Sequence, residues 1–343
     1  MGGLRKMTKK TLLGLVQAVI AAGLLVFLAA RMWKAGTLSR MEDSFARAAD
    51  GWPWIAAGML SFGICIALCT IRWSLLIRAQ GFPVPMRRLG MLYLVGHFFN
   101  TFLPGATGGD IVKAYYAALE SPDRRAEAVT TVFIDRIIGL LGLILLTVLV
   151  TALRLRFFLN VPRMKWALAV NVALLFGTAA AAFVLFRRHL FEEGSVLSKV
   201  ARGRCGGALR KAYEALRFCV LHRSLVSMTL LISVINHLVL VFCAYLLGRG
   251  LNMRLPLADC LAIFPVINTI SALPFTPSGF GTRENAAVFF LAALGASEAD
   301  ALSLCLLFDA AILGWGIAGG MTYIAFRPPS RPETSAALEQ GGS

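Results

Sequence analysis

The sequence predicts an all-α fold, a polytopic bundle of helices that crosses a membrane several times. Of its 343 residues, 58% are hydrophobic and 15% are charged, whereas soluble domains are roughly 45–50% apolar. The apolar residues form runs long enough to cross a bilayer. The basic residues lie in short segments between these runs. The net charge of +16 therefore fits the positive-inside pattern of membrane proteins, and we expect no nucleic-acid partner.

Six apolar runs reach the length of about 20 residues that a transmembrane helix needs. We predict full spans over residues 11–30, 52–77, 129–153, 166–186, 225–247 and 301–326. The first run follows a basic start, as a signal peptide would, but a signal peptide has an apolar core of only about 7 to 15 residues. We therefore interpret it as the first span. Residues 1–326 form a single transmembrane domain, and residues 327–343 are predicted to be disordered.

Two further apolar regions, residues 91–119 and 258–294, are each interrupted by a helix-breaking segment. Residues 103–110 read LPGATGGD, and residues 274–284 read PFTPSGFGTRE. Broken backbone at membrane depth leaves amides unpaired unless it is buried in protein or lines a polar cavity. We therefore predict two broken or re-entrant helical elements around a shared cavity. The span count rises to eight if both regions cross the membrane.

Loop charge predicts the orientation. Residues 187–224 contain nine Lys or Arg against three Glu, so this loop should be cytoplasmic. It is either an amphipathic surface helix or a solvated linker. Both termini are then cytoplasmic. This orientation places the loop 154–165 on the outer side of the membrane, although that loop is also basic. The two broken elements would enter from opposite faces, a pattern typical of the inverted repeats of transporters.

The first break has the residues of an anion site at a helix start. Thr107 lies three positions before Asp110 and precedes an apolar helix, which fits an N-cap with an acid in the first turn. Gly108 and Gly109 leave backbone amides approachable, and such amides attract phosphate. Lys113, one turn later, either adds positive charge or pairs with Asp110. The alternative is a capped helix after a turn.

The second break repeats this order. Thr282 is expected to cap a helix, and Glu284 to complement its dipole. Arg283 has a planar fork of donors that suits a phosphate. Alternatively, Arg283 forms an internal ion pair with Glu284 or Asp110.

Asp135 and Arg136 lie inside the third predicted span. Neighbours on a helix point about 100° apart, so each should bond to a different element. Arg136 either faces the cavity with Asp110 or snorkels to the interface. Asn100 either lines the cavity or pairs with a freed carbonyl.

Other polar residues inside apolar runs are interpreted mainly as structural. His97 and the pair Asn236-His237 should form interhelical hydrogen bonds. Gly316 and Gly320 should allow close helix packing. Asp309 is either part of a proton path or the partner of a buried arginine.

Three ordered motifs resemble a known family. They are Phe98-Phe99-Asn100-x-x-x-Pro104-Gly105-x-x-Gly108-Gly109-Asp110, then Asp135-Arg136 with Gly139, then Pro277-x-Gly279-x-Gly281-x-Arg283-Glu284. This pattern resembles the flippase-like transmembrane domain of lysylphosphatidylglycerol synthases and its stand-alone relatives. The resemblance covers nearly the whole chain. It implies a multi-pass protein of the bacterial inner membrane, or of an archaeal membrane, that moves lipid between leaflets.

The predicted function is therefore that of a membrane lipid translocase for a phosphate-bearing lipid. The resemblance stops at the transmembrane domain, so we expect no aminoacyl-transferase domain, no catalytic residue, no metal and no cofactor. The expected partners are phospholipids, glycolipids or polyprenyl phosphates, with anionic lipids at the basic loop; the oligomeric state is left open. The predicted substrate-binding residues are Asn100, Pro104, Gly105, Thr107, Gly108, Gly109, Asp110, Lys113, Asp135, Arg136, Pro277, Gly279, Gly281, Arg283 and Glu284.

Two other functions are compatible with these residues. One is a membrane scaffold that presents lipid to a partner enzyme. The other is an intramembrane hydrolase in which Asp110 and Asp135 share a proton. Arg136, beside Asp135, argues against the hydrolase because it would hold a carboxylate ionised.

Overall fold

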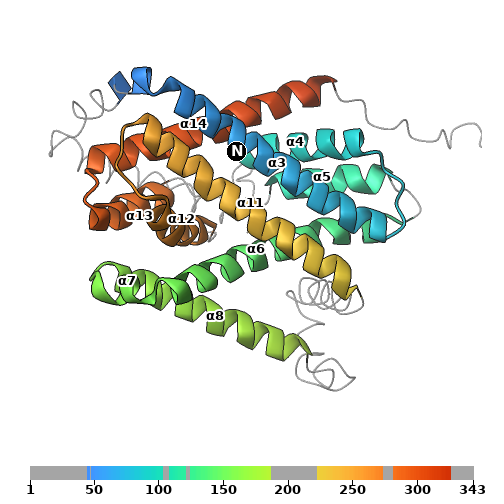
Figure 1. Cartoon of the computed structure of the whole chain (residues 1–343). Coiled ribbons are helices and arrows are strands. Elements are labelled where there is room, and N and C mark those ends of the chain that lie inside the picture. The colour runs from blue at the N-terminus through green and yellow to red at the C-terminus, as the bar shows by residue number, and fades with distance from the viewer. Residues whose placement is uncertain are drawn as a thin grey trace, which may run out of the picture.

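The computed structural model describes residues 45–46, 48–102, 108–120, 124–186, 222–272 and 281–325. These ranges contain helices and no strand (Figure 1), so the all-α prediction is confirmed for them. Within them, four helices are long and apolar enough to cross a membrane. They are α3 (Trp52–Ala79), α6 (Arg125–Leu153), α11 (Arg223–Gly250) and α14 (Glu298–Ala325).

These four helices coincide with predicted spans to within a few residues. A further helix, α8 (Met164–Phe186), occupies the predicted span 166–186. Between α6 and α8 the chain forms the short helix α7 (Leu155–Asn160), which the sequence did not predict; its Phe158 is fully buried. The predicted span 11–30, most of the basic loop 187–224 and the tail 327–343 lie outside the described residues.

The first broken region consists of two short helices, α4 (Met86–Phe102) and α5 (Gly108–Glu120). Arg88, near the start of α4, donates from Nε to Glu120 at the end of α5 over 2.5 Å. Near their other ends, Gly96 lies against Gly109 and Lys113. The two helices are therefore antiparallel. The longer has 17 residues, or about 26 Å at 1.5 Å per residue, which is shorter than the roughly 30 Å core of a bilayer.

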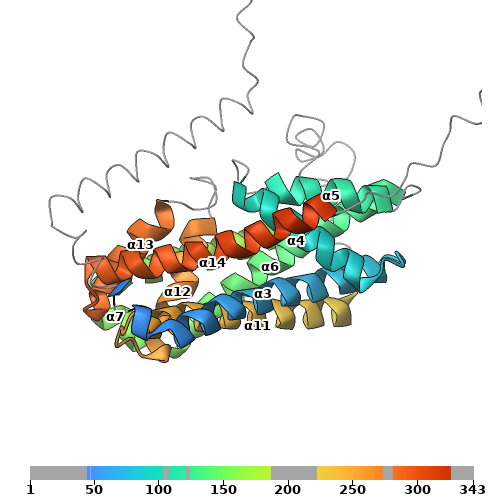
Figure 2. The same ribbon diagram turned by 90° about the horizontal axis from the view of Figure 1, so that it is seen from above.

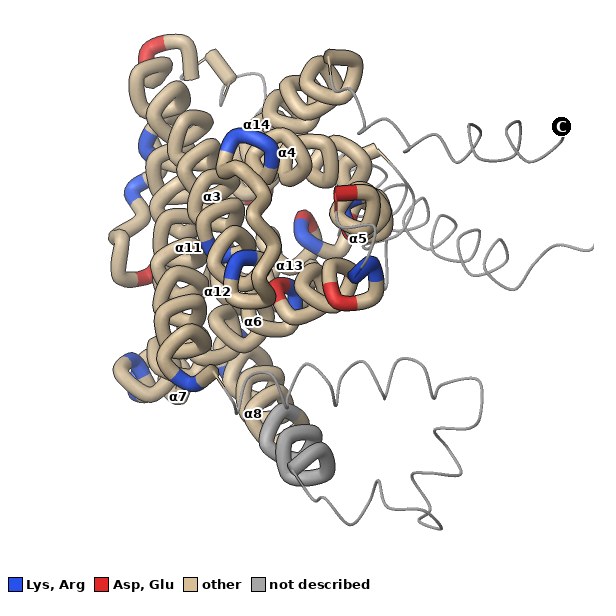
Figure 3. Tube along the Cα trace, turned by 90° about the vertical axis from the view of Figure 1, so that its right-hand side faces the viewer, with Lys and Arg blue, Asp and Glu red and all other residues tan. Residues whose placement is uncertain are grey.

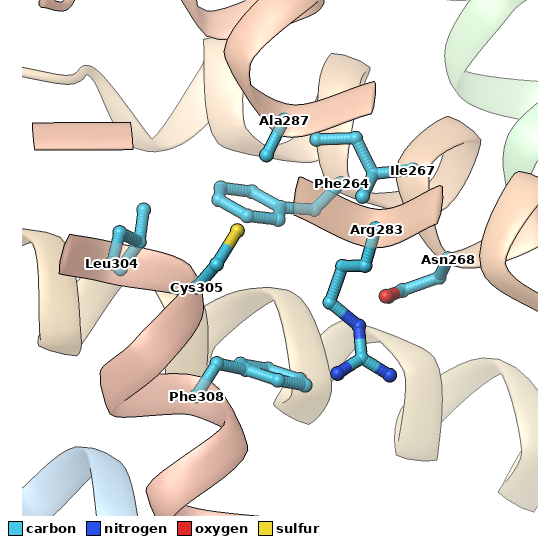
Figure 4. A pocket seen from close by; sticks show the side chains of 8 residues that line it. All are labelled: Phe264, Ile267, Asn268, Arg283, Ala287, Leu304, Cys305 and Phe308. Atoms are coloured by element: carbon cyan, nitrogen blue, oxygen red, sulfur yellow. The ribbon is translucent and has the colours of Figure 1, made fainter. Parts of the chain in front are cut away.

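The second broken region has the same construction. It consists of α12 (Leu257–Ala272) and α13 (Thr282–Leu291), followed by the 3-10 helix η4 (Ala292–Leu294). Phe264 and Asn268 of α12 share a small hollow with Ala287 and Arg283 of α13 (Figure 4). Because the later residue of α12 meets the earlier residue of α13, these helices are also antiparallel. Both regions thus have the form of helical hairpins.

The hairpins lie toward opposite ends of the long helices. In Figures 1 and 2, α4 and α5 lie toward one end of α3 and α14, and α12 and α13 lie toward the other. This is the arrangement that an inverted repeat would produce, although the repeat itself stays a prediction.

Small residues bring the long helices close to their neighbours. A Cβ atom on Gly319 of α14 would lie 2.2 Å from the carbonyl oxygen of Leu94 in α4. Gly316 faces Thr101 and Gly320 faces the Phe98 ring, at 3.2 and 2.9 Å from the Cβ each would carry. The predicted close packing at Gly316 and Gly320 is therefore confirmed, and it holds α4 against α14.

Candidate functional site

A cavity of about 380 Å³ opens among the helices of the bundle. The cavity wall includes Asn100 and Asp110 of the first hairpin. It also includes Asn268, Ser271 and Arg283 of the second. Acidic and basic positions gather in this region between α5, α6, α12 and α13 (Figure 3). The two broken regions therefore line one cavity with their inner ends.

Arg136 of α6 and Asp110 of α5 form an ion pair on the cavity wall, with Arg136 Nη1 donating to Asp110 Oδ2. Their side chains are 37% and 23% exposed. Of the two alternatives for Arg136, the structure shows the one that faces the cavity with Asp110. A partly exposed pair of this kind can exchange partners at modest cost.

Asp135 bonds to other elements, as the helical geometry predicts. Arg72 Nε of α3 donates to Asp135 Oδ1 over 2.8 Å, and Lys113 Nζ of α5 donates to Oδ2 over 3.1 Å. Arg72 also donates to Ser233 Oγ of α11 over 2.8 Å. The three charged side chains are no more than 5% exposed, so one carboxylate ties three helices together.

Lys113 is the partner of Asp135, not of Asp110, and it does not contribute to the cavity wall. Its ammonium lies 4.4 Å from the centre of the Trp73 ring and 4.3 Å from that of Tyr93. Cation–π contacts of this kind are strongest away from water. Lys113 therefore has a structural role.

Arg72 lines the cavity and was missed by the sequence analysis. The available signal was a single arginine inside the apolar span 52–77, five residues before its end, where a charge is costly and needs a partner. Gly139 of α6 makes room for it, because a Cβ there would lie 3.2 Å from Arg72 Nη1. Asn268 and Ser271, just before the second break, were also missed.

Arg283 pairs with Asp309 of α14, Nη1 donating to Oδ1. The predicted ion-pair partners of Arg283, Glu284 or Asp110, were therefore wrong. Of the two alternatives for Asp309, the structure shows the partner of a buried arginine. The two side chains are 13% and 12% exposed. Figure 4 shows the guanidinium between Phe308 and Asn268. Arg283 Nε is buried and has no hydrogen-bond partner among the described residues.

Helix-start amides are already bonded at both breaks. Gly109 N donates to Asn100 Oδ1 over 2.8 Å, and Gly281 N donates to Glu284 Oε2 over 2.6 Å. Gly281 is the N-cap, at φ +81°, so the prediction that Thr282 caps α13 was wrong. Asn100 and Glu284 therefore occupy one candidate phosphate-donating amide at each break.

The remaining predicted residues divide into two groups. Pro104, Gly105, Thr107, Pro277 and Gly279 lie outside the described residues. His97 Nε2 lies 3.2 Å from the Ile312 carbonyl oxygen, and His237 Nε2 lies 3.0 Å from that of Gly139. Both contacts join different helices, as predicted, whereas Asn236 Oδ1 is buried without a hydrogen-bond partner among the described residues.

The charged groups on the cavity wall favour an anionic ligand. Three arginines line it, Arg72, Arg136 and Arg283, against two carboxylates, Asp110 and Asp135. Each of these arginines is paired with a carboxylate in the structure: Arg72 with Asp135, Arg136 with Asp110, and Arg283 with Asp309. Guanidinium groups bind phosphate or carboxylate through paired, charge-assisted hydrogen bonds.

Comparison with known proteins gives the same family as the three motifs. A family model described as the lysylphosphatidylglycerol synthase TM region matches residues 14–320. The chain is 27% identical over 274 residues to a UPF0104 membrane protein of Methanothermobacter thermautotrophicus, covering 75% of this chain and 80% of the relative. It is 21% identical over 268 residues to a UPF0104 membrane protein of Methanocaldococcus jannaschii, covering 74% and 78%. No solved structure matches the chain.

Proposed function

The chain belongs to the lysylphosphatidylglycerol synthase transmembrane region family and is a multi-pass membrane protein; from this premise we propose that it moves a lipid with an anionic, phosphate-bearing headgroup between the leaflets. The observation that carries the proposal is the cavity where the inner ends of the two hairpins meet. Arginines from three helices line it: Arg72 from α3, Arg136 from α6 and Arg283 from α13.

The arrangement suits transport better than permanent binding. The hairpins approach the cavity from opposite ends of the long helices (Figure 2). Rocking of one hairpin against the other opens the cavity to one leaflet at a time, as in transporters with broken helices. The headgroup stays with the arginines while the hydrocarbon chains remain in lipid.

The intramembrane hydrolase fits the geometry less well. Asp110 pairs with Arg136, and Asp135 is held between Arg72 and Lys113. A proton shared between two carboxylates requires them to be neighbours that lack such cations. The scaffold predicts lipid binding without movement, so the experiment that follows separates it from a translocase.

The test is a translocation assay with the full chain in vesicles of phosphatidylcholine and fluorescent phosphatidylglycerol. A membrane-impermeant quencher reports how fast the label leaves the outer leaflet. We expect wild type to accelerate this movement and the double variant Arg136→Ala, Arg283→Ala to lose most of the acceleration. Arg249→Ala, which removes an exposed arginine at the end of α11, is the matched control. Equal rates for all three proteins would exclude the proposed role of the cavity.

A further inference from the structure

A second cavity, of about 350 Å³, lies between α5 and α6. Its apolar wall consists of Ile111, Ala114, Tyr115, Val132 and Phe133, together with Val129. Ile111, Tyr115 and Phe133 are 64%, 57% and 44% exposed, so the cavity is a groove on the outside of the bundle. We call it the α5–α6 groove.

The groove and the cavity of the candidate site, which we call the headgroup cavity, share two wall residues. Asp110 and Arg136 line both, so their ion pair stands at the junction. On one side of the pair the wall is apolar; on the other it includes Arg72, Asp135 and Asn100. An apolar groove that ends at a guanidinium has the polarity of an amphiphile with an anionic head.

The ion pair at the junction is the one best able to exchange partners. The Arg72–Asp135 pair is only 5% exposed at each side chain, and the Arg283–Asp309 pair is 13% and 12% exposed. The Arg136–Asp110 pair is 37% and 23% exposed. Breaking a buried pair leaves an uncompensated charge unless another charged group takes the partner's place. The greater exposure of Arg136 leaves room for such a group to approach it.

We propose that the α5–α6 groove holds a hydrocarbon chain of the transported lipid, and that the headgroup reaches the cavity by replacing Asp110 as the partner of Arg136. The lipid therefore enters sideways from the bilayer between α5 and α6. This inference rests on the proposed function, which it deepens by naming the chain site and the route of entry.

Two substitutions fill the groove. Ile111→Trp adds bulk at an exposed position that should tolerate it, and Ala114→Trp adds bulk at a position that is 9% exposed. Leu149→Trp is the control, because Leu149 is also exposed on α6 but lies outside the groove. A folding defect caused by Ala114→Trp would not affect the test with Ile111→Trp.

Two measurements distinguish binding of the lipid's hydrocarbon chain from binding of its headgroup. In the first, the full-length protein is purified from vesicles that contain equal amounts of phosphatidylcholine and phosphatidylglycerol. Mass spectrometry then counts the phosphatidylglycerol that stays bound to the protein. In the second, calorimetry measures the binding of glycerol phosphate, which has the head but no chain. We expect both groove variants to retain several-fold less phosphatidylglycerol while binding glycerol phosphate as wild type does, and Leu149→Trp to match wild type in both measurements.

If Ile111→Trp retains as much phosphatidylglycerol as wild type, the proposal that the α5–α6 groove holds a hydrocarbon chain is overturned. A parallel loss of glycerol phosphate binding overturns it too, because that loss would show that the substitution damages the cavity. The proposed function is tested separately by Arg283→Ala. If this variant keeps glycerol phosphate binding and lipid retention, the proposal that the headgroup binds in this cavity is wrong, whatever the groove variants show. If it loses both while the groove variants lose neither, only the groove fails.

Discussion

Asp135 and Arg136 are neighbours in the chain, yet they belong to different parts of the molecule. Asp135 holds Arg72 and Lys113 inside the bundle, while Arg136 faces the cavity with Asp110. The helical period predicts that the two side chains diverge, but not which partners they meet, because partner choice depends on helices far away in sequence. The same limit explains why Asp309 was not assigned to Arg283. Arg72, by contrast, could have been found, because it is the single charged residue of the apolar span 52–77.

Neutralising Asp135 should destabilise the protein. Asp135→Asn leaves Arg72 and Lys113 buried without their shared carboxylate, which costs about 3–5 kcal/mol for a buried pair. Glu127→Gln is the control, because Glu127 pairs with Arg124 near the surface, where such a pair is worth about 0–1 kcal/mol. Thermal unfolding in detergent measures both. Equal melting temperatures for the two variants would contradict the structural role of Asp135.

Asp110 should compete with the ligand for Arg136. Asp110→Asn removes this competing carboxylate, so glycerol phosphate should bind several-fold more tightly to the variant, while Arg136→Gln should weaken its binding. Calorimetry on the purified full chain gives both affinities. Weaker binding by Asp110→Asn would show that Asp110 supports the anion site instead of competing with it.

The α4–α14 contact is a matter of backbone approach. A side chain at Gly319 would meet the Leu94 carbonyl oxygen, whereas Gly314 on the same helix has no atom within 4 Å of a Cβ built there. Gly319→Leu should therefore destabilise the protein by about 1–3 kcal/mol through overpacking, and Gly314→Leu should have little effect. Melting temperatures compare the two. A similar loss at both positions would indicate a general effect of the longer side chain.

The long helices could be predicted closely from apolar runs, because only a helix satisfies its backbone in lipid over that length. The broken regions could be located but not resolved into hairpins or crossings. In the first region, the contacts of Arg88 with Glu120 and of Gly96 with Gly109 show that α4 and α5 are antiparallel, as in a hairpin. These contacts join residues on different helices, and hydropathy contains no information about them. The helix α7 was missed because its six residues are too few for a periodic signal.

The orientation of the whole molecule is still a prediction from loop charge, and labelling can test it. In a variant without the seven native cysteines, we introduce Arg87→Cys at the start of α4 or Arg254→Cys between α11 and α12. The two positions adjoin opposite hairpins, so an impermeant thiol reagent should reach Arg254→Cys from outside intact cells and Arg87→Cys only after permeabilisation. Labelling of both from the same side would exclude hairpins that enter from opposite faces.

The site as a whole depends on where a lipid headgroup rests among the arginines. A cryo-electron microscopy map of the full chain in nanodiscs that contain phosphatidylglycerol observes this directly. We expect a headgroup phosphate within hydrogen-bonding distance of Arg136 and Arg283, with the Arg136–Asp110 pair separated. A map with that pair closed, side chains filling the cavity and phosphatidylglycerol only around the outside of the bundle would contradict lipid transport through this site.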